Sequence, residues 1–215
     1  MDGAQGVRDT LFGDMPIDRW TGEDAGADGY PWTAFREARA RAAAGAIDEA
    51  KRSWQEIAAH PGLESRHYLQ AWQFLRHHGE RPPPSVEKDV LGVVVEMPLP
   101  GGLDVLAVYA DASARYYNHA GGGIVLDRAE GPLAELMEVL LAFAKDLVAS
   151  IGPWDGTRPG PPPPQHARLS FLTPGGLHFG EGSLKALEAD PVAGPVLRGA
   201  AAVMVELMAT EASGA

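Results

Sequence analysis

Between residues 88 and 130 the chain consists of short apolar segments separated by turns. Each segment is too short to form a typical helix. The segment 90–97 is mostly apolar and β-branched, which is typical of a strand covered on both faces. Further strands are predicted over 103–109, 114–119 and 124–126. Because the turns between them are short and rich in Gly, Pro and Asp, we expect an antiparallel meander of four strands.

A long helix is expected next, with Pro132 in its first turn and an apolar stripe over 133–148. A hairpin follows, with strands predicted at 167–173 and 177–179, and a final helix carries apolar residues at helical spacing over 196–208. The predicted fold class is therefore α+β, an antiparallel sheet packed by long helices in the order ββββ-α-ββ-α. This order resembles that of profilin-like and roadblock-like sheets, which implies a non-catalytic platform.

The chain before this sheet has a different character. Residues 1–30 are rich in Gly and Asp without a helical or strand period, and we interpret them as a flexible acidic tail. Residues 31–84 show helical spacing and end in three successive prolines, which cannot continue a helix. The helices are expected at 33–44, 46–60 and 64–78. We therefore predict three parts: the tail, this helical segment, and a sheet domain over 85–215.

Large apolar side chains stand among the acids of the predicted tail, at Leu11, Phe12, Ile17 and Trp20. One interpretation is that this stretch tucks these groups onto the body of the protein. The other is a short docking motif for a partner. Burial on the chain's own surface requires no second molecule, so the first interpretation is the simpler one.

The helical segment resembles the second half of a tetratricopeptide repeat over residues 33–61. The resemblance is carried by a small residue in the first helix, a Gly turn, an Ala and an aromatic on the second helix, and a closing proline: Ala38, Gly45, Ala46, Ile47, Asp48, Glu49, Ala50, Trp54 and Pro61. One repeat is too short for a superhelical array, which needs about three. The resemblance implies a helical hairpin used for packing or for contact with a protein.

Composition and charge exclude several classes of protein. The chain has no cysteine, so no disulfide, thiolate nucleophile or cysteine metal site is possible. The net charge is −11, and the mildly basic stretch 31–85 intersperses eight basic with six acidic residues, so we expect no nucleic-acid binding. The N-terminus lacks a secretory pattern and we expect no membrane span, so a cytoplasmic location is predicted. The Ala-, Gly-, Pro- and Arg-rich composition indicates a bacterial source.

No motif for catalysis or cofactor binding is recognised. Gly121–Gly123 precedes a strand instead of a helix and lacks the Lys of a phosphate-binding loop. Gly180–Ser183 lacks the second flank of a serine-hydrolase turn, and Ser183 is predicted to cap a short helix instead. The seven histidines show no metal-ligand spacing. We therefore expect no catalytic residue, no cofactor and no metal.

Two clusters remain as candidates for contact with a ligand or partner. The first is Arg115, Tyr117 and His119, which alternate along the predicted third strand and are expected on one face of it. A polar and aromatic face of this kind can line a ligand pocket. It can equally be the solvent face of an edge strand.

The second cluster lies in a proline-rich loop. Trp154, Asp155 and Arg158 combine an aromatic ring with two charges, a combination that suits recognition of a partner. Alternatively, Trp154 pins the loop to the body. The five prolines over 159–164 are interpreted as a stiff spacer. His178 is expected to join one of the two clusters or to be simply hydrogen-bonded.

These patterns predict a non-catalytic protein-interaction protein of a bacterial cytoplasm, an adaptor, scaffold or regulatory protein with a protein partner. The alternative is an enzyme or small-molecule sensor with an unfamiliar site near Tyr117, His119 and His178. A third hypothesis is a regulatory domain that only forms a homodimer.

Overall fold

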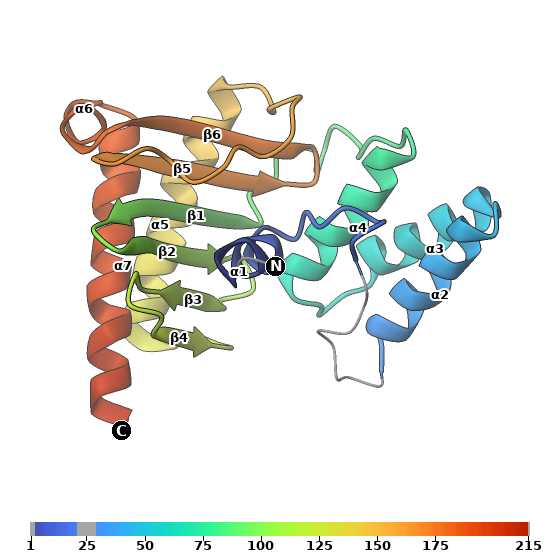
Figure 1. Ribbon diagram of the computed structural model, residues 1–215, viewed down its shortest axis with the longest axis horizontal. Helices are drawn as coiled ribbons and strands as arrows, with labels where there is room; N and C mark the ends of the chain where they lie inside the picture. The colour runs from blue at the N-terminus through green and yellow to red at the C-terminus, as the bar shows by residue number, and fades with distance from the viewer. Residues whose placement is uncertain (1–2, 21–28, 215) are drawn as a thin grey trace. The chain divides into compact units, whose positions relative to one another are not determined.

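The computed structural model describes residues 3–20 and 29–214 (Figure 1). The chain forms two compact units, Met1–Glu87 and Lys88–Ala215. The first unit is helical within the residues described, and the second combines a sheet with helices. The class is α+β, as predicted.

The second unit contains a six-stranded sheet whose neighbouring strands are all antiparallel. Its order across the sheet is β4-β3-β2-β1-β5-β6. The strands are β1 (Gly92–Leu99), β2 (Gly102–Tyr109), β3 (Ala114–Tyr117), β4 (Gly123–Leu126), β5 (His166–Thr173) and β6 (Gly176–Ser183). The antiparallel meander of the first four strands and the later hairpin are therefore confirmed.

One face of this sheet is covered by two long helices, α5 (Gly131–Ser150) and α7 (Ala193–Gly214), which run side by side (Figure 1). A short helix, α6 (Leu184–Ala189), joins β6 to α7, and the Ser183 side chain accepts a hydrogen bond from the Ala186 N–H as its predicted cap. Strand alternation directs every second side chain of each strand toward the helices. Val95, for example, pairs with Leu106 on β2 and Leu169 on β5, and all three are core residues.

A lysine at the start of the second unit caps the end of α5. The Nζ atom of Lys88 lies 3.1 Å from each of three carbonyl oxygens, those of Val148, Ala149 and Ile151. Carbonyls at a helix C-terminus lack intrahelical partners and carry partial negative charge, so a cation there is stabilising. The sequence pattern offered no sign of this contact, which joins positions about sixty residues apart.

The helices of the first unit are α1 (Gly3–Phe12), α2 (Trp32–Ala43), α3 (Ile47–Ala59) and α4 (Ser65–His77). The prediction of a segment without regular structure is wrong for residues 3–12, which form α1. A helix of ten residues is marginal by itself, but Leu11 and Phe12 are buried and tertiary packing supplies the stability that composition does not indicate. Residues 21–28, also assigned to the tail, lie outside the described residues.

Aromatic side chains form the core of the helical unit. Phe74 of α4 packs against Trp20, Phe35 and Trp54, with ring centroids 5.3 to 6.0 Å apart. Trp20 is therefore buried on the chain's own body, as the simpler interpretation expected. Gln70 of α4 reinforces this arrangement, because its side chain both accepts from the N–H and donates to the carbonyl of Met15.

The α2–α3 hairpin places the residues of the tetratricopeptide resemblance at its contact surface. Ala38 and Ala50 are fully buried and small, so the two helices approach closely, and Trp54 is buried beside them. Gly45 occupies the turn with φ +84°, a left-handed conformation that favours glycine. This geometry is compatible with the resemblance, but helical hairpins of other families share it, so membership of that family stays a prediction.

Candidate functional site

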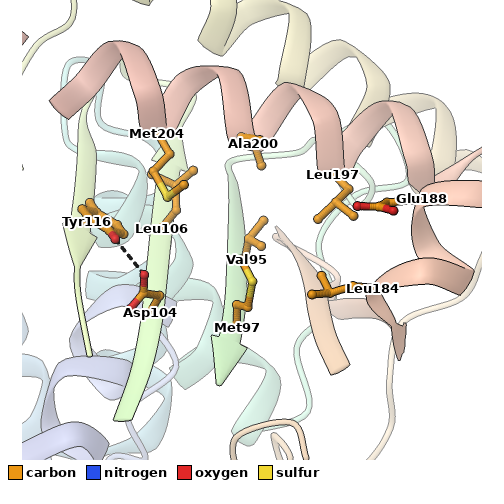
Figure 2. Close-up of a pocket in the computed structure, with 11 residues that line it drawn as sticks. Val95, Met97, Asp104, Leu106, Tyr116, Leu184, Glu188, Leu197, Ala200 and Met204 are labelled. Carbon is orange, nitrogen blue, oxygen red and sulfur yellow. Dashed lines mark hydrogen bonds between the residues drawn. The ribbon is translucent and has the colours of Figure 1, made fainter. Parts of the chain in front are cut away.

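A cavity of about 210 Å³ lies between the sheet and the helices α6 and α7 of the second unit (Figure 2). Its lining comes from three strands, β1, β2 and β3, and from two helices, α6 and α7, which are far from those strands in the sequence. The lining residues are Val95, Met97, Asp104, Leu106, Tyr116, Leu184, Glu188, Leu197, Ala200, Ala201 and Met204. The walls are mostly apolar, with polar groups from Asp104, Tyr116 and Glu188.

Strand register explains why these residues share one face. Met97 pairs with Asp104, Val95 pairs with Leu106, and Leu106 pairs with Tyr116 on the next strand. Paired and alternate positions project from the same side of a sheet, so all five side chains face the helices.

Two helices close the cavity. Leu184 and Glu188 are four residues apart on α6, which places them on the same side of that helix. Ala200 and Ala201 of α7 are small, so the helix leaves space above the sheet where larger residues would fill it. The cavity is thus a consequence of short side chains on α7 opposite Val95.

A network of hydrogen bonds organises one end of the cavity. The Tyr116 hydroxyl donates to Oδ2 of Asp104 at 2.7 Å, drawn as a dashed line in Figure 2. The backbone N–H of His119 donates to Oδ1 of Asp104 at 2.7 Å, and Nδ1 of the same histidine lies 2.8 Å from that oxygen. The Asp104 side chain is 12% exposed and the His119 side chain 42% exposed. Asp104 is therefore held in one orientation at the edge of the cavity.

These bonds shift the acidities of both partners. Burial raises the pKa of the Asp104 carboxyl, but the hydrogen bonds from Tyr116 and His119 outweigh burial, and the pKa lies below its ordinary value. Burial raises the pKa of Tyr116 to about 12, and the hydrogen bond to Asp104 and its negative charge act in the same direction. At neutral pH this end of the cavity therefore holds a carboxylate and a protonated phenol.

The structure separates the first predicted cluster. The Arg115 guanidinium is buried, donates to the carbonyls of Ala114 and Leu126 and pairs with Asp127, so it links β3 to β4. The Tyr117 ring packs across Gly123 of β4, since a Cβ added there would lie 2.7 Å from the ring. His119 alone among the three contacts a residue that lines the cavity. It lies beyond the end of β3, where strand alternation no longer determines which way a side chain points.

The second predicted cluster lies on the loop after α5. Trp154 is 47% exposed, its Nε1–H donates to the Thr157 carbonyl, and its ring packs edge-on against Phe179 at 5.4 Å. It therefore attaches the loop to β6 while leaving much of the indole in solvent. Asp155 is exposed and Arg158 is half-buried, and neither lines the cavity.

His178 is buried on β6 and does not line the cavity either. It pairs with Phe171, a residue of the sheet core, so it lies on the helix-covered face. The predicted grouping of Tyr117, His119 and His178 into one site is not present around this cavity.

Sequence reasoning missed Asp104, Tyr116 and Glu188. One signal was available: Asp104 is the only acid between Met97 and Ala110, within a segment that otherwise reads as a buried strand. A charged side chain inside such a segment requires a partner, and the neighbouring strand supplies it.

Within residues 3–20 and 29–214, no group of three or more His, Asp or Glu side chains is arranged to hold a metal ion.

Among the same residues, one helical segment, Ala193–Glu211, is long and apolar enough to cross a membrane, which sequence analysis did not expect. A third of this segment is buried, through one face that includes Val196, Leu197, Ala200, Val203 and Leu207.

The sequence matches no protein-family model, no curated protein and no solved structure.

Proposed function

We propose that the sheet unit binds a small, largely apolar molecule in the cavity between β1–β3 and α6–α7, and that the protein acts as a sensor and not as an enzyme. The observation that carries this proposal is the combination of an apolar cavity with one carboxylate held in a fixed orientation at its edge. Small-molecule sites generally have this composition, with apolar walls and a few polar groups that orient the ligand.

The lining residues favour binding over chemistry. The Tyr116 hydroxyl is the only hydroxyl among the lining side chains, and its raised pKa of about 12 keeps it protonated at neutral pH. It therefore donates a hydrogen bond and is a poor nucleophile. Asp104 already accepts hydrogen bonds from two residues, which stabilises its charged form and makes it a weak base.

The volume limits the size of the ligand. Drug-sized molecules occupy sites of about 300 to 1,000 Å³. An apolar cavity of about 150 Å³ is sufficient for benzene. The 210 Å³ cavity therefore suits a molecule of roughly six to ten non-hydrogen atoms.

A binding titration followed by NMR tests this proposal. Small neutral probes such as hexan-1-ol and benzyl alcohol should shift the methyl resonances of Met97 and Met204, which line the cavity. Ala201→Phe places a ring at an exposed lining position and should weaken probe binding. Val205→Phe on the same helix is the matched control, since Val205 is 60% exposed and does not line the cavity. Absence of any methionine shift with any probe would contradict the proposal.

A second candidate function is protein contact through the helical unit, in an adaptor or scaffold role. It is favoured by the α2–α3 hairpin, where Ala38, Ala50 and Trp54 are buried at positions that match the tetratricopeptide resemblance. The charges on its outer surface, including Arg52 and Glu56, are then available for a partner.

Affinity purification from the native host tests this role. A stoichiometric partner should be lost when Arg52→Glu and Glu56→Lys are combined in the full-length protein. Glu135→Lys, which changes an exposed charge on α5, is the control and should retain the partner. Recovery of the same proteins with both variants would exclude the hairpin as the contact.

A further inference from the structure

The charges around the cavity discriminate between classes of ligand. Its lining contains two carboxyl side chains, Asp104 and Glu188, and no Lys or Arg. The nearby His119 is hydrogen-bonded to Asp104 and is not itself a lining residue. An anionic ligand would meet two carboxyl groups and no Lys or Arg among the lining side chains, whereas a cationic ligand would meet attraction.

The two carboxyl groups lie at opposite ends of the apolar floor. Figure 2 shows Asp104 with Tyr116 at one end and Glu188 with Leu184 at the other, with Val95 and Ala200 between them. The site therefore has an apolar middle and an acidic group at each end. A molecule that matches it has an apolar middle and a cation at each end.

Asp104 retains capacity for one more hydrogen bond. A carboxylate offers about four acceptor positions. Tyr116 occupies one on Oδ2, and the backbone N–H and ring Nδ1 of His119 occupy two on Oδ1. The remaining position on Oδ2 suits the N–H of an ammonium group, and such charge-assisted bonds are stronger than neutral ones.

Glu188 makes a weaker contribution for a physical reason. Its side chain is exposed at the mouth of the cavity, where solvent screens an ion pair. The two ends are therefore unequal: Asp104 supplies most of the selectivity for a cation, and Glu188 adds a smaller preference for a second one.

We propose that the ligand is a short aliphatic diamine, with one ammonium bound to Asp104, the methylene chain along Val95 and Leu106, and the other ammonium at Glu188. The inference deepens the proposed function and depends on it. Amino acids match the site less well, because their α-carboxylate adds a negative charge where the lining already has two carboxyl groups. Aliphatic amines resemble the Lys side chain, whose ordinary pKa is about 10.4, so both ends are charged at neutral pH.

Calorimetric titration of the full-length protein at low ionic strength provides the test. The probes are hexane-1,6-diamine, hexylamine, hexan-1-ol and hexanoate, which share one chain length and differ in their end groups. Hexylamine should bind about tenfold or more tightly than hexan-1-ol, because a hydrogen bond to a charged group is added. The diamine should bind a further two- to fivefold more tightly, roughly the value of an exposed ion pair. Hexanoate should bind more weakly than the alcohol.

Substitutions at Asp104 and at Glu188 test the two ends of the cavity separately. Asp104→Asn should weaken binding of both amines about tenfold or more relative to binding of hexan-1-ol by the same variant. Glu188→Gln should remove only the additional preference for the diamine, and its exposed position carries little risk to folding. Glu135→Gln on the exposed surface of α5 is the control for a change of one charge outside the cavity lining.

The outcomes separate this inference from the function on which it rests. If hexan-1-ol binds as tightly as both amines, the cavity binds ligands but the amine inference is wrong. If hexylamine and the diamine bind with equal affinity, the proposed binding of a second ammonium and the proposed role of Glu188 are contradicted. If none of the probes binds, the proposed function fails together with the inference.

Discussion

Two separate nitrogen atoms of His119 approach one oxygen of Asp104. The backbone N–H donates to Oδ1 at 2.7 Å, and Nδ1 of the ring lies 2.8 Å from the same atom. Asp104 belongs to β2, while His119 lies in the turn after β3. The contact therefore fixes the β3–β4 turn against the neighbouring hairpin and orients the carboxylate that edges the cavity.

Gly102 permits this close approach. A Cβ at Gly102 would lie 2.7 Å from the carbonyl oxygen of His119, closer than real Cβ atoms come to backbone atoms. Gly102→Ala should therefore displace His119 and weaken its contact with Asp104, with a loss of about 1–3 kcal/mol in unfolding free energy. Gly101→Ala is not a matched control because Gly101 has φ +97°. Gly180→Ala is better, since nothing lies within 4 Å of a Cβ there. Equal stability of Gly102→Ala and wild type in urea titrations would contradict the prediction.

Tyr116 makes stability depend on pH in the alkaline range. Its pKa is about 12 in the folded protein against 10.0 for a free tyrosine, so the unfolded chain loses this proton first. Because the folded state then binds more protons than the unfolded state, the free energy of unfolding falls as pH rises from about 10 to about 12. The contribution is fully present below pH 10.

Tyr116→Phe isolates this effect. The variant should lose about 1–3 kcal/mol near neutral pH, because the bond to the Asp104 carboxylate is gone. The difference in unfolding free energy between variant and wild type should narrow by about 2 kcal/mol between pH 10 and 12. The other tyrosines are present in both proteins, so their titration does not contribute to this difference. Urea titrations at a series of pH values measure it. A difference that does not change with pH would show that Tyr116 is not perturbed.

Arg168 connects the proline-rich loop to the sheet. Its buried guanidinium pairs with Glu181, lies 3.6 Å from the fully buried Glu96, and donates to the Gly160 carbonyl at 2.6 Å. Arg168→Met should lower the free energy of unfolding by about 3–5 kcal/mol, because removing one partner of a buried ion pair leaves buried charge uncompensated. It should also accelerate proteolysis within residues 159–164. Glu181→Gln, at a more exposed partner, should cost much less, and equal losses in the two variants would contradict this account.

Lys88 stabilises the C-terminal end of α5. Lys88→Met should lower the free energy of unfolding by about 1–2 kcal/mol, because three carbonyl oxygens lose a charged donor. Hydrogen exchange should increase in the last turn of α5 before it increases elsewhere in that helix. Lys145→Met is the control, because Lys145 is an exposed cation on the same helix. Unchanged exchange at Val148 and Ala149 in Lys88→Met would refute the capping role.

Periodicity predicted the helices from α2 onward and the strands, with α1 missed, and the departures at strand ends have local causes. The third strand was expected to reach His119 but ends at Tyr117. The Asn118 side chain accepts the N–H groups of Ala120 and Gly122, which forms a turn in place of further strand pairing. The last strand was expected over 177–179 but extends to Ser183, since Gly180 and Gly182 pair with β5 although glycine carries no apolar signal.

Patterns in the sequence were sufficient to predict the type and order of the elements from α2 onward. A period of two or of 3.6 residues records which side of a segment is apolar, and that property is local. The sequence by itself also determined the absence of cysteine chemistry. The cavity was decided by tertiary structure alone, because Asp104, Tyr116 and Glu188 are brought together only by the strand register and by the path of α6 and α7. No local pattern encodes which distant residues meet, since many registers satisfy the same alternation and packing of the whole unit selects one.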